Sequence, residues 1–350
     1  MFSITKTYYN WFMMTKILST RRLQLLLILL LIVSATGCGT KSRDSIRPPQ
    51  KNVKKPKAPP IDLQKIKPNE LGKVLILEYH DVSDKEARWS RHYNNFKADL
   101  QRLYQAGYRP VSLRDFVRNR ISVPAGMSPV VFTFDDATEG QFRYTDTAID
   151  PNCAVAILED FHEKHPGWAL EATFYVYYPN PFRQPKLIEK KLRHIISQGM
   201  DIGNHTYSHV NLKKLSSIDA AKEIALSVQA ARNYAPKAIV DSIALPYGLG
   251  PVDEAVLRSG EYDGQNYQNI AALLVGAEPA LSPADTKFNP YRLPRVQAIQ
   301  SELDMWLGYF KRHPEKRYIS DGDPDTITAP KSLAGNIDHG RLAGKRPRSY

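Results

Sequence analysis

The sequence predicts an α/β fold, most simply a distorted (β/α) barrel with about seven strands. Short apolar segments alternate along most of the chain with longer segments whose apolar residues recur at helical spacing. Such alternation is typical of a parallel sheet whose strands are connected by helices. With 42% hydrophobic and 24% charged residues, the 350-residue chain has an ordinary globular composition, which excludes a disordered or fibrous protein.

Strands are predicted where the chain is continuously apolar or rich in β-branched and aromatic residues. The segment 73–79 (KVLILEY) has the pattern of a buried strand, and 172–178 (ATFYVYY) combines aromatic and β-branched residues. In chain order, the predicted strands are 73–79, 108–112, 130–134, 172–178, 201–203, 239–245, 270–275 and 292–297.

Helices are predicted between these strands. The segment 96–106 (FKADLQRLYQA) repeats apolar residues at helical spacing and stops at Gly107, and a serine N-cap opens the helix 217–233. In chain order, the predicted helices are 96–106, 113–119, 152–164, 186–197, 217–233, 252–258 and 301–310. The tail from Pro314 is polar, and we expect it to be weakly structured.

The N-terminus is predicted to be a lipoprotein signal peptide over residues 1–37. Two arginines, Arg21 and Arg22, precede an apolar run shorter than the ~20 residues of a membrane-spanning helix, and small residues follow that run. The ending ATGC (35–38) resembles a bacterial lipoprotein box, in which Cys38 is acylated and becomes the mature N-terminus. An uncleaved anchor or a plain signal peptide is the alternative. We therefore expect an extracytoplasmic, membrane-anchored lipoprotein of the cell envelope.

Residues 38–70 are predicted to be the lipidated cysteine and a Pro- and Lys-rich tether. Six prolines between residues 39 and 70 favour an extended backbone. The leader carries +4 and the tether +6 of the formal charge of +12, which leaves +2 for residues 71–350. We therefore expect no nucleic-acid footprint on the folded part. The basic tether could bind an anionic polymer or lipid, and a linker without a binding role is the alternative.

Polar side chains gather where predicted strands end, at the rim that carries the reactive groups of such barrels. His205 and His209 are four residues apart, which on one helical turn places both imidazoles on the same face. With one carboxylate they make a set typical of a catalytic metal site. Asp135 and Asp136 end another strand, and a bound cation would relieve their repulsion. The alternatives are two surface histidines and a helix N-cap pair.

Five strings occur in order at predicted strands or their ends: YHDV (79–82), VVFTFDDA (130–137), ATFYV (172–176), DIGNHTYSH (201–209) and ALPYG (244–248). Together they resemble the NodB-type polysaccharide deacetylases of carbohydrate esterase family 4, over about residues 74–300. The resemblance implies a NodB homology domain, assigned to residues 71–312 and followed by a polar C-terminal tail over 313–350. It also implies hydrolysis of N-acetyl groups from N-acetylglucosamine polymers with a divalent metal, often zinc.

The resemblance also implies residue roles. Carried over by position, Asp136, His205 and His209 resemble the family's metal ligands, and Asp135 resembles its general base. The metal would lower the pKa of water toward ~7, and Asp135 would take the proton as water attacks the acetyl carbonyl. A backbone N–H near Tyr247 would stabilise the developing oxyanion.

The string PYG (246–248) would bind substrate as well. Pro246 and Tyr247 would present an aromatic face to a sugar ring, and a tight turn with no binding role is the alternative. His80 is a candidate group near the leaving amine, and an inward structural histidine is the alternative. Poly-N-acetylglucosamine deacetylases of this family also begin with a YH strand and vary the Arg motif, so the resemblance is closer to that branch.

Two departures from the family pattern affect the prediction. Ala244 replaces the family's arginine that pairs with the base, and no late Leu-x-His segment supplies a general acid. We hypothesise that Arg295, in RLPRV, pairs with Asp135 instead, and a surface arginine is the alternative. The predicted activity is therefore metal-dependent N-deacetylation of an extracytoplasmic exopolysaccharide or peptidoglycan. The alternatives are a catalytically impaired polysaccharide-binding lipoprotein and an amide hydrolase for a substrate other than a sugar.

Overall fold

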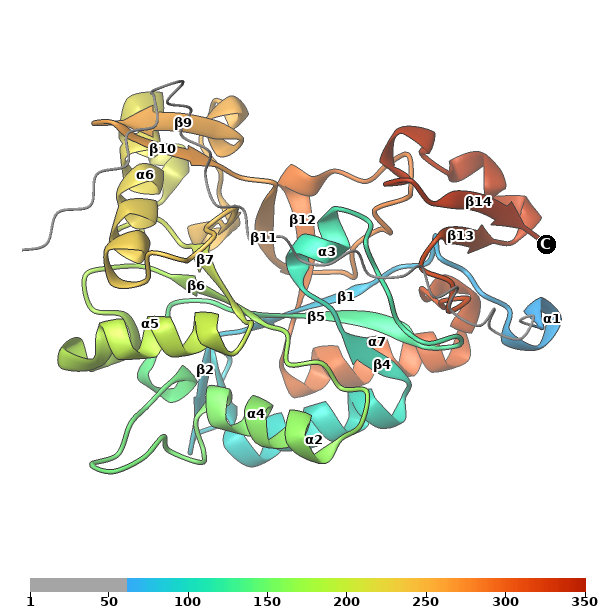
Figure 1. Cartoon of the computed structure of the whole chain (residues 1–350), viewed down its shortest axis with the longest axis horizontal. Coiled ribbons are helices and arrows are strands. Elements are labelled where there is room, and N and C mark those ends of the chain that lie inside the picture. Colours follow the sequence, from blue (N-terminus) through green and yellow to red (C-terminus); the bar gives the residue numbers. More distant parts are fainter. Residues whose placement is uncertain (1–61) are drawn as a thin grey trace, which may run out of the picture. The chain divides into compact units, whose positions relative to one another are not determined.

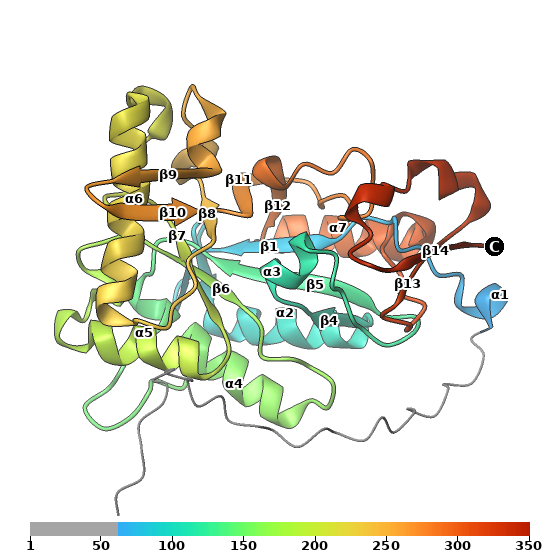
Figure 2. The same ribbon diagram turned by 45° about the horizontal axis from the view of Figure 1, so that its top comes forward.

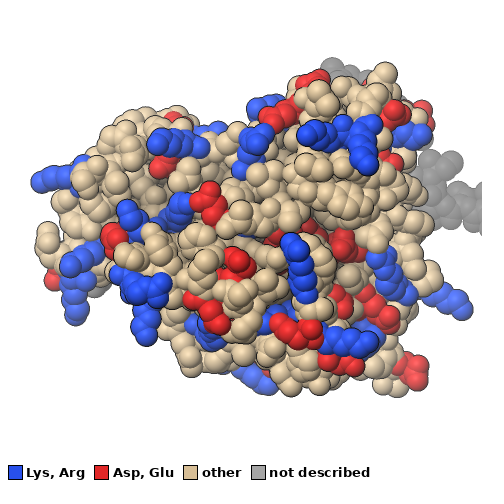
Figure 3. All heavy atoms as spheres, turned by 180° about the vertical axis from the view of Figure 1, so that it is seen from behind, with Lys and Arg blue, Asp and Glu red and all other residues tan. Residues whose placement is uncertain are grey.

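The computed structural model describes residues 62–350. The predicted signal peptide (1–37), Cys38 and most of the predicted tether lie outside the described residues. Among the helices of residues 62–350, none is long and apolar enough to cross a membrane. Basic and acidic side chains are interspersed over the face shown in Figure 3, in keeping with the small net charge calculated for this part.

Within the described residues, seven parallel strands close into a barrel, which confirms the predicted fold (Figure 1). The strands are β1 (Leu75–Tyr79), β5 (Ser128–Phe134), β6 (Thr173–Val176), β7 (Asp201–Asn204), β8 (Ser242–Ala244), β11 (Ala271–Ala277) and β12 (Leu293–Gln297). The ring runs in the order β1, β12, β11, β8, β7, β6, β5 and closes through the β5–β1 pair. A further strand, β4 (Tyr108–Pro110), pairs with the first residues of β5.

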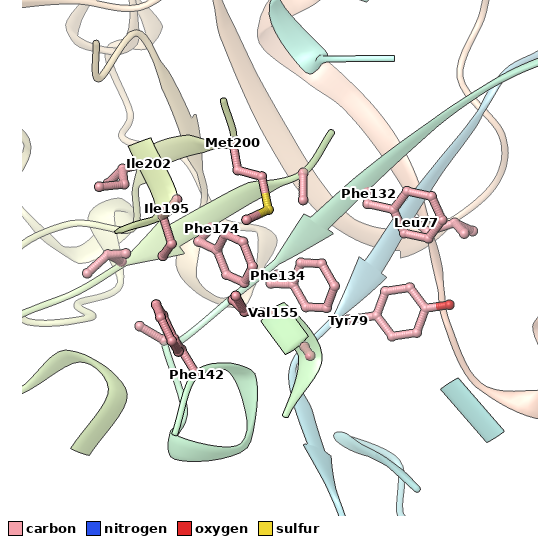
Figure 4. Packing of buried hydrophobic residues seen from close by; sticks show 14 of the residues in the cluster. Leu77, Tyr79, Phe132, Phe134, Phe142, Val155, Phe174, Ile195, Met200 and Ile202 are labelled. Atoms are coloured by element: carbon pink, nitrogen blue, oxygen red, sulfur yellow. The ribbon is translucent and has the colours of Figure 1, made fainter. Parts of the chain in front are cut away.

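Side chains alternate along each strand, and the two faces build two separate cores. Leu77 and Tyr79 of β1 point outward and pack with Phe132, Phe134 and the surrounding helices (Figure 4). Ile76 points the opposite way and belongs to a second cluster. The ring strands contribute to this cluster the side chains on the face opposite the first. The second cluster therefore fills the barrel interior. Burying one such large apolar side chain contributes about 1.5–3 kcal/mol, so the two cores account for the closure of the ring.

The outer helices agree with the predicted order. They are α2 (Tyr93–Gln105), α3 (Leu113–Val117), α4 (Ala154–Lys164), α5 (Ile188–Ser197), α6 (Ser217–Tyr234) and α7 (Gln300–Arg312). Ser216 caps α6, because its side chain accepts a hydrogen bond from the N–H of Asp219 at 3.1 Å. The predicted helix 252–258 is wrong, since only a 3₁₀ turn, η6 (Glu254–Leu257), forms in the short stretch before the next strand.

Two pairs of short strands between residues 81 and 268 were not predicted. The antiparallel pair β9 (Ser259–Tyr262) and β10 (Gln265–Gln268) lies beside α6 in both views (Figures 1 and 2). Asp263 and Gly264 connect it with φ values of 50° and 75°, which is the backbone that an Asp-Gly hairpin turn requires. The second pair, β2 (Asp81–Ser83) and β3 (Ser90–His92), follows β1 directly and adds a wall beside the barrel rim.

The expectation that the tail from Pro314 is weakly structured is wrong. Tyr318 is fully buried and belongs to the interior core, and Ile319 pairs with Asn69 through backbone hydrogen bonds. The parallel pair β13 (Thr326–Ala329) and β14 (Arg346–Ser349) lies at the same end of the barrel as α1 (Leu63–Ile66) in Figures 1 and 2. The end of the predicted tether is therefore folded too, since Asn69 and Glu70 are buried against this tail.

Candidate active site

The three predicted metal ligands come together at the rim where β5 and β7 end. The Oδ1 atom of Asp136 lies 3.3 Å from Nε2 of His205 and 3.2 Å from Nε2 of His209. One ligand atom from each residue lies within 4.8 Å of the other two. Two imidazole nitrogens and one carboxylate oxygen that converge in this way suit a divalent transition metal with positions left open for water.

The two histidines do not lie on a helical turn, as their spacing suggested. Residues 205–211 form an irregular loop in which Thr206 and His209 have left-handed backbones, with φ values of 59° and 57°. The side chain of Asn204 accepts from the N–H of Thr206 at 2.8 Å, and Oγ1 of Thr206 accepts from the N–H of Val210 at 3.2 Å. These side chains accept hydrogen bonds from backbone N–H groups that could otherwise bond within a helix. An irregular loop, and not a helical turn, therefore brings the two imidazoles together.

Left-handed backbone also occurs elsewhere at this rim. Asp136, Ala137 and Tyr247 have φ values of 75°, 45° and 61°. This conformation costs a non-glycine residue on the order of 1 kcal/mol or more. Surrounding contacts hold it in place, for example the hydrogen bond from the N–H of Phe182 to the carbonyl of Ala137 at 2.6 Å. Such strain persists where tertiary contacts over-determine the backbone, which is typical of functional sites.

Ala244 sets the orientation of His205. The Nδ1 atom of His205 lies 2.8 Å from the carbonyl oxygen of Ala244, so Nδ1 donates and Nε2 turns its lone pair toward Asp136. Burial opposes protonation of His205, but the charges of Asp135 and Asp136 outweigh it and raise the pKa of this imidazole. Burial raises the pKa of Asp136, yet its contacts with both histidines lower that pKa well below the usual range. Ligand orientation and negative potential therefore both fit a bound cation.

Asp135 is held in the barrel interior by Arg295. The guanidinium donates two hydrogen bonds to the carboxylate, to Oδ1 at 2.8 Å and to Oδ2 at 2.7 Å. Both side chains are at most 1% exposed. Burial raises the pKa of Asp135, but the positive charge of Arg295 outweighs it, and the net pKa lies below the usual value. The pairing expected from the sequence is present, and it reaches the carboxylate from β12.

Glu78 of β1 is a buried member of the site that sequence reasoning missed. Its Oε1 accepts from Arg295 at 3.2 Å, and its Oε2 accepts from the N–H of Gly276 at 2.8 Å. Burial, as the largest effect, raises the pKa of this carboxyl. The signal was available, because Glu78 is the one charged residue in the apolar run VLILEY (74–79), and a buried charge needs a partner.

Glu78, His80 and Asp135 form a second group of converging ligand atoms. Arg295 donates to both carboxylates, so a second metal there would be repelled by the guanidinium. The Nε2 atom of His80 lies 3.9 Å from Oε1 of Glu78, and its ring centroid lies 4.4 Å from that of Trp89. His80 therefore lies between the two carboxylates and the indole of Trp89.

Tyr247 lies beside His209, one of the predicted metal ligands. Its side chain belongs to the 3₁₀ turn η5 (Pro246–Gly248), is 61% exposed and has its ring centroid 5.1 Å from that of His209. Pro246 is buried, and a Cβ at Gly248 would lie 3.1 Å from the backbone nitrogen of Val275. The turn thus presents an aromatic ring beside the ligands, where a sugar ring could contact it.

Residues 123–265 match the family model described as polysaccharide deacetylase. The chain carries a polysaccharide deacetylase domain. The match includes Asp135, Asp136, His205, His209 and Tyr247. His80, which directly follows β1, and Arg295 of β12 lie outside it. The deacetylase domain thus uses residues from both sides of the matched segment to complete its rim.

Sequence relatives of the domain were found among curated proteins. The Bacillus subtilis (strain 168) protein YxkH is 24% identical over 276 residues, which cover 76% of this chain and 88% of that protein. A chitooligosaccharide deacetylase from Bradyrhizobium sp. (strain ANU 289) is 26% identical over 137 residues, 39% of this chain and 54% of that protein. A peptidoglycan-N-acetylglucosamine deacetylase from Bacillus cereus is 26% identical over 157 residues, 44% of this chain and 49% of that protein. The chain thus spans about half the length of the latter two relatives.

Solved structures share the fold of the deacetylase domain. A polysaccharide deacetylase from Bacillus cereus superimposes with a TM-score of 0.52 at 18% identity, covering 67% of this chain and 68% of that chain. The Streptococcus pyogenes deacetylase PplD, solved with acetate, gives a TM-score of 0.51 at 18% identity and covers 67% of this chain and 97% of that chain. At this identity the likeness supports the barrel fold.

Proposed function

We propose that the protein removes N-acetyl groups from a polymer that contains N-acetylglucosamine, in a reaction that depends on a divalent metal. One observation carries this proposal: Asp136 converges with His205 and His209, while its neighbour Asp135 is held apart by Arg295. In this proposal Asp136 binds the cation and Asp135 accepts a proton. Relatives named as chitooligosaccharide and peptidoglycan-N-acetylglucosamine deacetylases support the substrate class.

Asp136, His205 and His209 would hold the metal, which we propose to be zinc. When bound, such a metal supplies water of lowered pKa and polarises an acyl carbonyl. Asp135 stays ionised next to Arg295 and accepts a proton as the acetyl group is attacked. Its bidentate contact fixes both oxygens, so the carboxylate keeps one orientation toward the rim.

The departing amine needs a proton, and we propose that His80 supplies it. A ring nitrogen of His80 converges with carboxylate oxygens of Asp135 and Glu78, and its Nε2 lies 3.9 Å from Oε1 of Glu78. On the opposite side of the metal ligands, Tyr247 offers its exposed ring to the sugar and its turn backbone to the developing oxyanion. Base and acid would therefore act from neighbouring strands, β5 and β1.

Acetate release measured on N-acetylglucosamine oligomers and on peptidoglycan, side by side, tests the proposal. We expect release from at least one substrate, its loss with a chelator and its recovery when zinc is restored. Asp135→Asn should lower the rate by about 10²–10⁴-fold and leave zinc binding intact. His209→Ala should instead weaken zinc binding. Oligomer binding without any acetate release would contradict the proposal and favour a polysaccharide-binding protein.

We also propose that a lipid on Cys38 anchors the protein to the membrane of the cell envelope. This proposal rests on the apolar run and the ATGC ending at residues 35–38. The acyl chain would add membrane affinity with each buried CH₂, and the basic tether would add attraction to anionic lipid. Cys38→Ala should move the protein out of the membrane fraction and abolish incorporation of labelled palmitate. An unchanged distribution would exclude a lipid anchor at this cysteine.

A further inference from the structure

Gln141, the last residue of the 3₁₀ turn η1 (Glu139–Gln141), bonds to the ends of two barrel strands at once. Its side chain is fully buried, and its Nε2 donates to the carbonyl of His80 at 2.5 Å and to the carbonyl of Asp135. Both hydrogens of one side-chain amide are thus used. The two acceptors belong to the residues proposed as the acid and the base.

These two hydrogen bonds begin where the pairing of β1 with β5 stops. The last opposed residues are Tyr79 and Phe134, and the N–H of Asp135 donates to the carbonyl of Tyr79 at 2.9 Å. Asp136 then takes a left-handed backbone, with a φ value of 75°, which interrupts the strand. The side chain of Gln141 therefore takes the place of the strand ladder as the connection between the two segments at the rim.

The turn that carries Gln141 is itself held in place. A Cβ at Gly140 would lie 2.1 Å from the carbonyl oxygen of Val82, so η1 packs directly on the backbone of β2. The Oγ1 atom of Thr138 donates to Oδ1 of Asp81 at 2.7 Å. Because the donor has a fixed origin, it can hold the two carbonyls at a fixed separation.

The imidazole of His80 depends on this connection more than the carboxylate of Asp135 does. Arg295 donates two hydrogen bonds to that carboxylate and fixes it independently. The Nε2 atom of His80 lies 3.9 Å from Oε1 of Glu78, and its ring centroid lies 4.4 Å from that of Trp89. Neither contact is a hydrogen bond. The position of the imidazole therefore depends on its backbone, and that backbone is bound by the turn η1.

We propose that Gln141 is a positioning residue, which holds His80 at a fixed distance from Asp135. The inference rests on the proposed function, in which Asp135 accepts a proton as the acetyl group is attacked and His80 gives one to the departing amine. Both proton transfers occur at the same amide, so the two side chains must keep one separation. Gln141 acts through the backbone of the two residues.

The effect of Gln141→Met on two kinds of substrate tests the inference, because this variant keeps the length of the side chain and removes both donors. We expect kcat for acetate release from N-acetylglucosamine oligomers to fall by about tenfold to a hundredfold, with KM changed by about twofold or less. On 4-nitrophenyl acetate the loss should be about threefold or less, because this leaving group departs without a proton and Arg295 still holds the base. Gln141→Glu, protonated in its buried position, keeps one donor and should lose less. If Gln141→Met does not fold, Gln141→Glu is compared in the same way.

Gln184→Met is the matched control. The Nε2 atom of Gln184 donates to the carbonyl of Tyr144, and its Oε1 accepts from the N–H of Tyr144, both at 2.9 Å. This variant therefore also loses two hydrogen bonds to the backbone. It should lose a similar amount of stability in urea and keep the wild-type kcat on both substrates. An equal loss of kcat in the two variants, or an equal loss on the two substrates in Gln141→Met, would overturn the inference.

Crystal structures of the variants separate this inference from the proposed function. In Gln141→Met the ring of His80 should move by about 1 Å or more relative to the carboxylate of Asp135, and in Gln184→Met it should stay in place. An unmoved ring in Gln141→Met would overturn the inference even if the rate falls. A ring that moves, in a protein whose wild type releases no acetate from any substrate, would contradict the proposed function and still identify Gln141 as the residue that positions His80.

Discussion

Arg295 organises the barrel interior at the level of single residues. It is fully buried and donates hydrogen bonds to Asp135, Glu78 and Thr133, and its Nε donates to the carbonyl of Leu274 at 2.7 Å. Charge-assisted bonds to two carboxylates offset the desolvation of the guanidinium. Without Arg295, two buried carboxylates would face each other with no counter-charge, and at least one would take up a proton.

We therefore predict that Arg295→Ala lowers acetate release by about a hundredfold or more, because Asp135 is then protonated or misplaced. Arg295→Lys keeps the charge but loses the planar pair of donors, so an intermediate loss is expected. Zinc affinity, measured by titration calorimetry, should stay close to that of the wild type, since Arg295 does not contact the three ligands. Wild-type activity in Arg295→Ala would show that Asp135 needs no partner.

At the scale of elements, strand β7 depends on a residue without a side chain. A Cβ at Gly203 would lie 2.3 Å from the ring of Tyr175 on the neighbouring strand β6. That ring is fully buried in the barrel interior, and its hydroxyl lies 3.1 Å from the hydroxyl of Ser242 on β8. The absence of a side chain at Gly203 thus leaves room for the ring of Tyr175 beside β7. In this region β7 and β8 have a single pair of opposed residues, Asn204 and Ile243.

Gly203→Ala should consequently destabilise the protein by about 1–3 kcal/mol or more, because the buried ring has no space to move. The free energy of unfolding in urea measures the effect. Gly335→Ala is the control, since a Cβ there meets nothing within 4 Å. A Gly203→Ala protein as stable as the control would mean that β6 and β7 can shift apart without cost.

A buried carboxyl joins the start and the end of the folded chain. Glu70 accepts hydrogen bonds from the N–H of Thr328 at 2.8 Å and from the hydroxyl of Ser320 at 3.2 Å. Burial and the nearby charge of Asp321 raise the pKa of Glu70 from 4.5 to about 7, although Lys345 lies close enough to lower it. Folding therefore shifts this carboxyl toward its protonated form relative to the unfolded chain.

This raised pKa predicts a pH dependence of stability. Between about pH 4.5 and pH 7 the folded protein binds more protons at Glu70 than the unfolded chain does, so stability falls as pH rises through this window. The loss amounts to about 3 kcal/mol by pH 7.5. Glu70→Gln removes the titrating group and should flatten this part of the profile, as measured by urea unfolding at several pH values. Parallel profiles of wild type and variant would contradict the raised pKa.

At the scale of the whole molecule, the C-terminal segment completes the barrel rather than trailing from it. Ile327, Ala329 and Ile337 form a small core with Leu71 and Ala284, and the fully buried Tyr318 reaches the interior core. Its carbonyl accepts a hydrogen bond from the hydroxyl of Ser128 at the start of β5. The segment therefore closes the end of the barrel opposite the catalytic rim, where the strands begin.

Removal of residues 313–350 should leave a protein that does not unfold cooperatively, because each lost large apolar contact is worth about 1.5–3 kcal/mol. Removal of residues 346–350 alone is the control, since β14 is exposed along its length. This shorter truncation should lower the stability much less than removal of residues 313–350. Circular dichroism during heating compares the two. If the longer truncation melts like the wild type, the C-terminal segment is dispensable for the barrel.

The sequence by itself determined the order of the barrel strands and of the outer helices, the barrel and the candidate metal-ligand set. Apolar periodicity indicates which residues are buried. The carboxyl ends of the strands in a parallel barrel lie at one rim, so the motifs TFDD (133–136) and HTYSH (205–209) were expected to lie close together. It also predicted the contact between Arg295 and Asp135, although a surface arginine remained an alternative.

Only the tertiary structure decided the rest. The partners of Glu78 and the folding of the tail depend on contacts between segments far apart in the chain, which leave no local period in the sequence. Tyr318, Ile327 and Ile337 are scattered among polar residues, and the clusters that bury them include distant residues such as Val74 and Leu71. The left-handed loop around His205 and His209 likewise follows from side-chain hydrogen bonds that spacing alone does not specify.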